Sequence, residues 1–521
     1  MATERRGVHG ALRHVLDYLN FERVRPLPQP TKASGFPAVK VLWFLLGVAG
    51  CLWAATLTGI PEKPRAMLAI ALPMSVWWIT EALPISITAL LPLVALPVLG
   101  LATPREAAAP YADPNVFLFI GGFILASCLQ KWGLHKRLAL LILLRFGGSA
   151  RSILLVCMGV TAFLSMWASN TATVLMMYPI ALALVDSGSS EDEAARHNFT
   201  TSLLLGIAYS ASMGGTATLI GTPPNIVFAA VVRRLDIGVR EVPFLHWMGV
   251  GLPLALVMLA VTYLLLTRVL YRFDANLFRT DTARLRSDLA ALGPLSRAEA
   301  YIAIAFTATA LLWITRKDID LGLLAVPGWS RLFTHGALIH DGMVAIAVSI
   351  LLFIIPVDRR QGIFLLDREW FRGIPWDIVM LFGGGFALAQ GFQSSGLSEF
   401  LGSHLGFLGT LPVLPMMVVI ALFITIVTNL TSNTATTTVM LPILAATALA
   451  TRTPPLLLML PATFAASAAF MLPVGTPPNA IIFGSGRITI PEMMRAGFLL
   501  TLLSAPIIAV MCWWLGPLML G

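Results

Sequence analysis

Apolar stretches long enough to cross a membrane recur along this chain from Lys40 to its C-terminus. A helix of about 20 apolar residues spans the hydrocarbon core of a bilayer. Only 12% of the 521 residues are charged and 57% are hydrophobic, whereas soluble domains carry roughly 25% charged residues. The sequence therefore predicts an all-α polytopic membrane protein.

Eleven of the apolar stretches are predicted to be transmembrane helices: 40–60, 66–82, 84–102, 114–131, 200–232, 243–270, 300–316, 341–356, 377–398, 455–486 and 497–519. Two further stretches, 152–186 and 411–451, are each interrupted by Ser-Asn-Thr. Their arms are short for a span of about 20 residues, so we expect two re-entrant hairpins with polar tips near mid-membrane. Non-helical backbone at that depth is tolerated only inside protein or beside a water-filled cavity.

The arginines predict an orientation. The first 39 residues carry Arg5, Arg6, Arg13, Arg23 and Arg25 without a continuous apolar core, so they are expected to be a cytosolic tail and not a signal peptide. Eleven crossings of the inner membrane then place the C-terminus on the extracytoplasmic side. Lys131, Lys136, Arg137 and the 272–299 linker fall inside. Other basic residues would lie outside, against the rule: Arg233, Arg234, Arg240, Arg316, Lys317 and Arg331.

An internal duplication organises the chain. Ser169–Thr173 and Ser432–Thr436 have the same sequence, Ser-Asn-Thr-Ala-Thr, at an offset of 263 that also maps Pro179 onto Pro442. Gly-Thr-Pro-Pro-Asn recurs at 221–225 and 475–479, at an offset of 254. After a first transmembrane helix at 40–60, we therefore predict one repeat at 61–271, with hairpin 152–186 and broken helix 200–232. A second follows at 300–521, with hairpin 411–451 and broken helix 455–486.

Each predicted repeat holds five crossings and one hairpin, and an odd number of crossings inverts the second repeat. The two hairpins would then enter from opposite faces and meet near the midplane, an architecture of secondary transporters. Close helix packing would also explain one isolated Ser-Asn-Thr motif. The paired, symmetric set favours a binding site.

The chemistry of the motifs suits an anion together with a small cation. No Arg or Lys lies near either motif in sequence, so an anion would be held by helix N-termini, whose free N–H groups and dipole favour negative charge. The same breaks leave free carbonyls, which with Asn and Ser/Thr oxygens form a neutral cage suited to Na⁺. Ser165 maps onto Thr428 by the 263 offset, so each half offers a hydroxyl one turn before its motif.

Other polar residues are expected to have structural roles. Glu81 is a functional candidate as an intramembrane acid, but a helix-end role before Pro84 explains it equally well. Asp113 and Asp377 are expected at helix starts, and His135 at the interface. The four cysteines lie in apolar segments without metal-ligand spacing and are expected to be reduced.

The doubled Ser-Asn-Thr, the doubled Gly-Thr-Pro-Pro-Asn and the Trp77–Pro84 segment (Trp-Trp-Ile-Thr-Glu-Ala-Leu-Pro) closely resemble the divalent anion/sodium symporter family. The resemblance extends from about residue 40 to the C-terminus. It implies a homodimer in which a mobile part of each protomer slides as an elevator, carrying Na⁺ and a dicarboxylate. By motif position, one Na⁺ site would use Ser165, Ser169, Asn170 and Gly221, and the other Thr428, Thr431, Ser432, Asn433 and Gly475. The substrate carboxylates would meet Asn170, Thr171, Thr222, Asn433, Thr434, Thr476 and Pro477.

The expected function is sodium-coupled symport of C4-dicarboxylates such as succinate, malate and fumarate. A sodium-independent exchanger of the same fold and a carrier of citrate or sulfate remain alternatives. The sequence shows no His/Asp/Glu cluster or nucleophile triad for an enzyme and no organic cofactor motif. The +9 net charge is attributed to topology and not to nucleic-acid binding.

Overall fold

The computed structural model describes residues 38–146, 148–187, 192–234, 241–274, 282–320, 325–367, 370–404 and 411–520. The N-terminal tail to residue 37, Arg240, and residues 275–281 of the predicted linker lie outside these ranges. The described chain is helical apart from two small hairpins, β1–β2 (Ile319–Asp320, Ala325–Val326) and β3–β4 (Pro356–Asp358, Ile363–Phe364).

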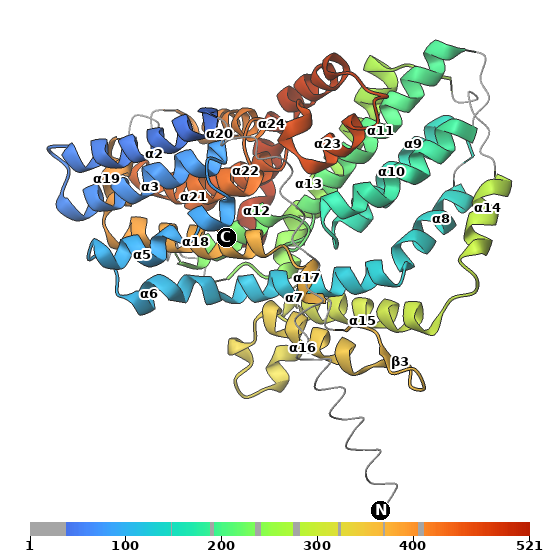
Figure 1. Ribbon diagram of the computed structural model, residues 1–521, viewed down its shortest axis with the longest axis horizontal. Coiled ribbons are helices and arrows are strands. Elements are labelled where there is room, and N and C mark those ends of the chain that lie inside the picture. The colour runs from blue at the N-terminus through green and yellow to red at the C-terminus, as the bar shows by residue number, and fades with distance from the viewer. Residues whose placement is uncertain are drawn as a thin grey trace, which may run out of the picture.

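The first part of the chain runs from the N-terminal helices to the first hairpin (Figure 1). Its helices are α2 (Ala38–Thr56), α3 (Glu62–Thr80), α4 (Ile85–Thr88), α5 (Leu91–Val98), α6 (Pro104–Ala108), α7 (Pro114–Lys131), α8 (Leu134–Phe146), α9 (Ala150–Ser165) and α10 (Asn170–Ser187). The stretch 84–102, predicted as one span, is instead the short helices α4 and α5. Pro92 lacks the N–H that would bond the Thr88 carbonyl, so a continuous helix is disfavoured there.

The central helices follow: α11 (Glu193–Thr216), α12 (Pro223–Arg234), α13 (Phe244–Leu264), which a π-helical turn extends to Leu270, α14 (Thr282–Ala291), α15 (Arg297–Ile314), α16 (Asp341–Ile354) and α17 (Trp370–Gly373). Every residue of α11 from Phe199 to Thr216 is buried, which makes α11 a central helix of the molecule. By contrast, α2 exposes most of its apolar side chains, as a helix facing lipid does.

The last part comprises α18 (Trp376–Ser394), α19 (Leu397–His404), α20 (Val413–Thr428), α21 (Asn433–Ala450), α22 (Pro455–Ala466), α23 (Pro477–Phe483) and α24 (Ile490–Leu520). Adding 263 to the bounds of α9 and α10 gives 413–428 and 433–450, which are the bounds of α20 and α21. The sequence duplication is therefore also a duplication of helix boundaries.

Six helices of the described chain are long and apolar enough to cross a membrane by length and composition: α2, Pro104–Lys131, Phe244–Leu270, α15, α21 and α24. Six shorter apolar helices, among them α9, α16 and α20, accompany them. These helices make the chain an all-α, multi-pass membrane protein. The total of eleven crossings and the inverted relation of the two halves stay predictions.

Ion pairs gather at the two ends of α7 and α15. At one end, Lys131 binds Asp367 at 2.7 Å and Arg137 binds Glu299 at 2.6 Å. Arg137 also donates to the carbonyls of residues 292–294, which tie α8 to the segment that precedes α15. These basic residues, all predicted on the cytoplasmic face, therefore lie on one side of the molecule.

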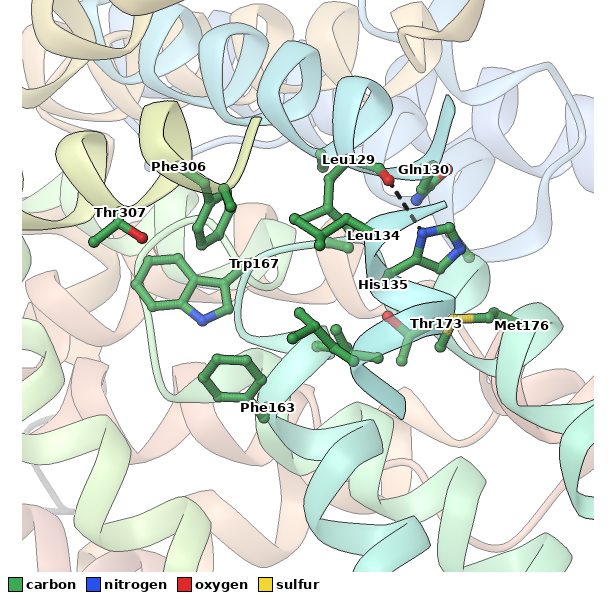
Figure 2. A pocket seen from close by; sticks show the side chains of 16 residues that line it. Leu129, Gln130, Leu134, His135, Phe163, Trp167, Thr173, Met176, Phe306 and Thr307 are labelled. Carbon is green, nitrogen blue, oxygen red and sulfur yellow. Dashed lines mark hydrogen bonds between the residues drawn. The ribbon is translucent and has the colours of Figure 1, made fainter. Parts of the chain in front are cut away.

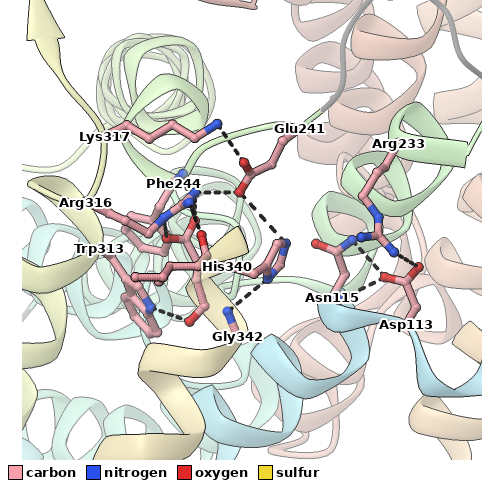
Figure 3. A network of polar contacts seen from close by, with 12 residues as sticks. Asp113, Asn115, Arg233, Glu241, Phe244, Trp313, Arg316, Lys317, His340 and Gly342 are labelled. Atoms are coloured by element: carbon pink, nitrogen blue, oxygen red, sulfur yellow. Dashed lines mark hydrogen bonds and ion pairs between the residues drawn. The ribbon is translucent and has the colours of Figure 1, made fainter. Parts of the chain in front are cut away.

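The opposite ends of α7 and α15 hold four of the six basic residues that conflict with the predicted orientation (Figure 3). Asp113, the N-cap of α7, accepts a hydrogen bond from Arg233 and one from Arg234, at 2.9 Å each. Just after α15, Arg316 binds both Glu241 and Asp341, and Lys317 binds Glu241. Because each binds a buried or half-buried acid, these cations have a role in the fold that is independent of orientation.

Candidate functional site

The first hairpin closes at residues 166–169, between α9 and α10. There the hydroxyl of Ser165 lies 2.6 Å from Asn170 Oδ1 and 2.7 Å from the Ala211 carbonyl oxygen in α11. Ser165 is fully buried. A serine hydroxyl carries one proton and can donate to only one of these acceptors at a time. The three oxygens therefore form a cluster, here called the first oxygen cluster, in which the hydroxyl donates to one oxygen and lies against the other.

The second hairpin repeats this geometry. The hydroxyl of Thr428, which is also fully buried, lies 2.7 Å from Asn433 Oδ1 and 2.8 Å from the Ala466 carbonyl oxygen in α22. We call these three atoms the second oxygen cluster. Each cluster thus combines a hydroxyl, an amide oxygen and a helix carbonyl, which lies inside α11 in the first cluster and at the end of α22 in the second. Oxygen ligands of this kind suit hard cations.

Glycines bring more backbone to the first oxygen cluster. A Cβ placed on Gly215 would lie 2.6 Å from Asn170 Oδ1 and 3.1 Å from the Gly221 carbonyl oxygen, and one on Gly221 would overlap the Gly215 carbonyl. Asn170, Gly215 and Gly221 are therefore in close contact. This arrangement brings together three of the four residues expected at the first Na⁺ site, namely Ser165, Asn170 and Gly221.

Fewer of the residues predicted at the second Na⁺ site contact one another. The hydroxyl of Thr431 lies 2.7 Å from the Thr436 hydroxyl and 3.0 Å from the Val427 carbonyl, so it faces α21 beyond the oxygen cluster. A Cβ on Gly475 would lie 3.3 Å from Ala469 Cβ and from the Asn429 carbonyl oxygen. Of the predicted residues, Thr428 and Asn433 meet directly, while Thr431 and Gly475 contact other groups.

Capping residues fix the N-termini of the half-helices. Ser432 and Thr476 are the N-caps of α21 and α23, and each accepts a backbone N–H from the first turn of its helix. Ser169 accepts the N–H of Ala172 at 3.2 Å in the same way. A side-chain oxygen at the N-cap satisfies one of the free N–H groups and leaves others for a ligand.

The remaining substrate candidates lie beside these caps. Thr171 and Thr434 are the second residues of α10 and α21, Thr222 directly precedes α12, and the exposed Pro477 begins α23. Within the described residues, no arginine or lysine hydrogen-bonds to any of the predicted site side chains. An anion there would have to be held mainly by backbone N–H groups and helix ends.

Sequence reasoning missed a function for the asparagine that ends each Gly-Thr-Pro-Pro-Asn motif. Asn225 Nδ2 donates to the carbonyls of Gly215 (3.0 Å) and Thr218 (2.7 Å), and Asn479 Nδ2 donates to those of Ala469 (3.0 Å) and Leu472 (3.1 Å). The acceptors correspond by the 254 offset. Both side chains are fully buried. The Asn in each motif could have indicated this role, because unwound backbone leaves carbonyls to which a nearby side-chain amide can donate.

The two halves interlock at these helices. α10 contacts α23, and α12 contacts α21, so each hairpin arm packs against a half-helix of the other copy. In Figure 1, α9 and α10 (green) lie side by side near α11 and α23, while α20 and α21 belong to the opposite part of the molecule. Glu81 lies apart from the site as the exposed, left-handed C-cap of α3 (φ 49°).

The sequence profile described as the sodium:sulfate symporter transmembrane region matches residues 39–520. The chain belongs to this family of membrane transporters. The match confirms the resemblance to divalent anion/sodium symporters. Among curated relatives of the sodium:sulfate symporter family, the sodium-dependent dicarboxylate transporter SdcS of Staphylococcus aureus is 42% identical over 468 residues. That alignment covers 89% of this chain and 88% of SdcS.

Two solved structures resemble the fold of this sodium:sulfate symporter family member at 12% sequence identity and a TM-score of 0.54. They are the YdaH transporter of Alcanivorax borkumensis, over 88% of this chain and 98% of that one, and MtrF of Neisseria gonorrhoeae, over 93% and 96%. At this identity the similarity concerns the fold alone. The two structures share the overall arrangement of helices with this chain.

Proposed function

We propose that the protein is a secondary active transporter that couples Na⁺ to the uptake of C4-dicarboxylates such as succinate, malate and fumarate across the inner membrane. The observation that carries this proposal is the pair of oxygen clusters, Ser165–Asn170–Ala211 and Thr428–Asn433–Ala466. In each, a buried hydroxyl lies within 2.8 Å of an amide oxygen and of a backbone carbonyl oxygen, so three neutral oxygens meet. The name of the relative SdcS supports both the ion and the substrate class.

Each oxygen cluster marks one proposed Na⁺ site. The first adds Ser169 and Gly221, and the second adds Thr431, Ser432 and Gly475. The contacts of Gly221 with Gly215 support its place at the first site. Thr431 and Gly475 would contribute backbone carbonyls, because the Thr431 hydroxyl already faces Thr436.

The dicarboxylate would lie between the N-termini of the half-helices. Its two carboxylates would contact Asn170, Thr171, Thr222, Asn433, Thr434, Thr476 and Pro477. The caps Ser432 and Thr476, the cross-packing of α10 on α23 and of α12 on α21, and the scarcity of positive side chains among their described contacts all support this arrangement. Four N-terminal helix dipoles would then stabilise the dianion.

The transport cycle is proposed to be an elevator in a homodimer, with the two hairpins and broken helices moving as one part. The N-terminus would lie in the cytoplasm and the C-terminus outside. The arginines of the N-terminal tail and the exposed Lys136, for which the described residues give no ion pair, support this orientation. A dianion that moves with two Na⁺ carries no net charge, so a membrane potential can drive uptake only if a third cation is coupled. Each net charge that crosses the membrane is worth about 2.3 kcal/mol per 100 mV.

Proteoliposomes of purified protein test the function. Labelled succinate is offered with an imposed Na⁺ gradient, with K⁺ replacing Na⁺ as the control, and with empty or succinate-loaded lumens. We expect Na⁺-dependent accumulation into empty vesicles. Uptake that ignores Na⁺ but requires internal succinate would identify an exchanger instead. Competition by unlabelled citrate or sulfate that exceeds competition by succinate would overturn the assignment to C4-dicarboxylates.

A further inference from the structure

A cavity of about 220 Å³ lies beside the first hairpin, outside the two oxygen clusters. Its walls come from α7, α8, α9, α10 and α15. Figure 2 shows its two sides: Gln130, His135 and Thr173 on one, and Phe163, Trp167 and Phe306 on the other. The cavity therefore has a polar side near the α7–α8 turn and an aromatic side near the hairpin tip.

The cavity adjoins the lipid-facing surface. Phe163, in its wall, is 49% exposed, and the helices around it expose further large apolar side chains. These are Leu141 of α8, Leu155 of α9, Leu175 of α10, and Ile304 and Leu311 of α15. In a membrane protein such side chains contact acyl chains. We therefore expect hydrocarbon to border the cavity at Phe163.

The polar side shows a second feature that points to a ligand. Thr173 is only 3% exposed and lines the cavity, and its hydroxyl has no partner among the described residues. A buried hydroxyl without a partner is costly. His135 Nδ1 lies 3.1 Å from the Leu129 carbonyl. If it donates there, Nε2 is the ring atom left to accept or, when protonated, to donate.

Lys136 follows His135 at the start of α8 and is exposed. Its neighbours Lys131 and Arg137 are bound to Asp367 and Glu299, whereas the described residues give Lys136 no ion pair. A lysine at the membrane surface attracts anionic lipid headgroups.

We propose that this cavity binds one acyl chain of an anionic phospholipid. The chain lies against Phe163, Trp167 and Phe306. The glycerol-ester oxygens lie at Thr173 and Gln130, where one of them accepts a hydrogen bond from the Thr173 hydroxyl. The phosphate lies at Lys136. An acyl chain gains no hydrophobic free energy on leaving the bilayer, so binding depends on dispersion contacts with the aromatic wall and on the polar contacts at the other side. The occupant would abut α10 one turn after Asn170, although its binding does not depend on the proposed function.

Photo-crosslinking of the full-length protein in nanodiscs tests this site. The probe is phosphatidylglycerol with a diazirine at mid-chain, present at a few per cent of the lipid, and labelled peptides are mapped by mass spectrometry. We expect labelling concentrated on residues 163–176 and 303–307. Labelling spread evenly over the exposed apolar residues of α2 and α24 would overturn the proposal.

Two variants on α15 provide the matched comparison. Ala303→Phe fills the cavity, whereas Ala308→Phe adds the same side chain at an exposed position of the same helix that does not line it. Labelling of 163–176 should fall to background in Ala303→Phe and persist in Ala308→Phe. Equal labelling in both variants would contradict binding in the cavity. Equal melting temperatures would show that both are folded.

The headgroup is tested separately with Lys136→Gln and a phosphatidylcholine probe. Phosphatidylglycerol should outcompete phosphatidylcholine in the wild-type protein, and this preference should fall by roughly fivefold in Lys136→Gln, the loss of one lysine's attraction to an anionic lipid. Equal labelling by the two lipids in the wild-type protein would overturn the choice of an anionic phospholipid.

Discussion

The two oxygen clusters contain the same kinds of atom, but the backbone around them is held in different ways. In the first copy, helix α11 gives way to α12 over residues 217–222, a break of six residues. In the second copy, α22 ends at Ala466 and α23 begins at Pro477, so the break covers residues 467–476. The second copy therefore has the longer unwound segment.

The means of support differ accordingly. In the first copy, close packing of Gly215 on Gly221 shapes the break, and the Thr218 hydroxyl donates to the Met166 carbonyl. The residue that corresponds to Met166 is Asn429. Its side chain accepts the N–H of Met471 and donates to the Thr425 carbonyl, both at 2.7 Å.

The difference separates what the two sites share from what each site needs locally. A hydroxyl, an Asn amide oxygen and a helix carbonyl are present in both copies, as expected of groups that bind the same ion. Asn225 and Asn479 bind the unwound carbonyls in both copies, but the additional support has diverged. The first break adds steric fit between glycines, and the second adds the Asn429 side chain. Variants made in matched pairs can test this division.

The largest effect is expected from removing the shared amide oxygen. Asn170→Ala and Asn433→Ala each delete one oxygen of a proposed Na⁺ site while α10 and α21 keep their N-cap serines. A contact to a charged group is worth about 1.5–3 kcal/mol, so the Na⁺ concentration for half-maximal uptake should rise about ten- to 150-fold in either variant. Uptake in proteoliposomes across a Na⁺ titration provides the measurement.

Asn198→Ala is the control for this pair, because Asn198 binds only the Arg272 carbonyl among its described partners, away from both clusters. Its Na⁺ dependence should match the wild type. Normal Na⁺ dependence in both Asn170→Ala and Asn433→Ala would mean that the motifs serve helix packing. An effect in one variant alone would show that the two clusters are not equivalent.

The next effect distinguishes steric support from hydrogen-bonded support. Gly221→Ala places a methyl group onto the Gly215 backbone carbonyl, which only a backbone shift can relieve. Overpacking of this kind costs about 1–3 kcal/mol, and because it displaces Asn170 as well, Na⁺ affinity should fall by roughly tenfold. The methyl group of Gly475→Ala would lie 3.3 Å from its nearest atoms, so this variant should lower Na⁺ affinity clearly less. Equal losses in the two variants would contradict the difference in framework.

The sequence predicted a large share of this architecture. The 263 offset located both hairpins, and the paired motifs identified Ser165, Asn170, Thr428 and Asn433, because duplicated residues with free oxygens can be recognised without coordinates. The partners Ala211 and Ala466 could not be predicted. They contribute main-chain carbonyls from helices about 40 residues away, and such an acceptor carries no side-chain signature.

The sequence also did not reveal the local differences between the two helix breaks. Asn429 was not among the predicted residues, since its function depends on the position of Met471 in a break whose length the sequence did not reveal. The division of 84–102 into α4 and α5 follows from Pro92, which the prediction from apolar composition did not take into account.

The smallest effect is expected from exchanging the local supports. Asn429→Met gives the second copy the residue of the first and leaves the Met471 N–H unpaired, at a cost of about 1–3 kcal/mol. Thr218→Val removes one neutral hydrogen bond in the first copy and should cost about 1 kcal/mol. Thermal unfolding in detergent, followed by tryptophan fluorescence, should therefore show a larger drop for Asn429→Met, with Na⁺ raising the melting temperature of both variants because the oxygen clusters are intact. A larger drop for Thr218→Val would mean that the first break also depends mainly on hydrogen bonding and not on the fit of Gly215 against Gly221.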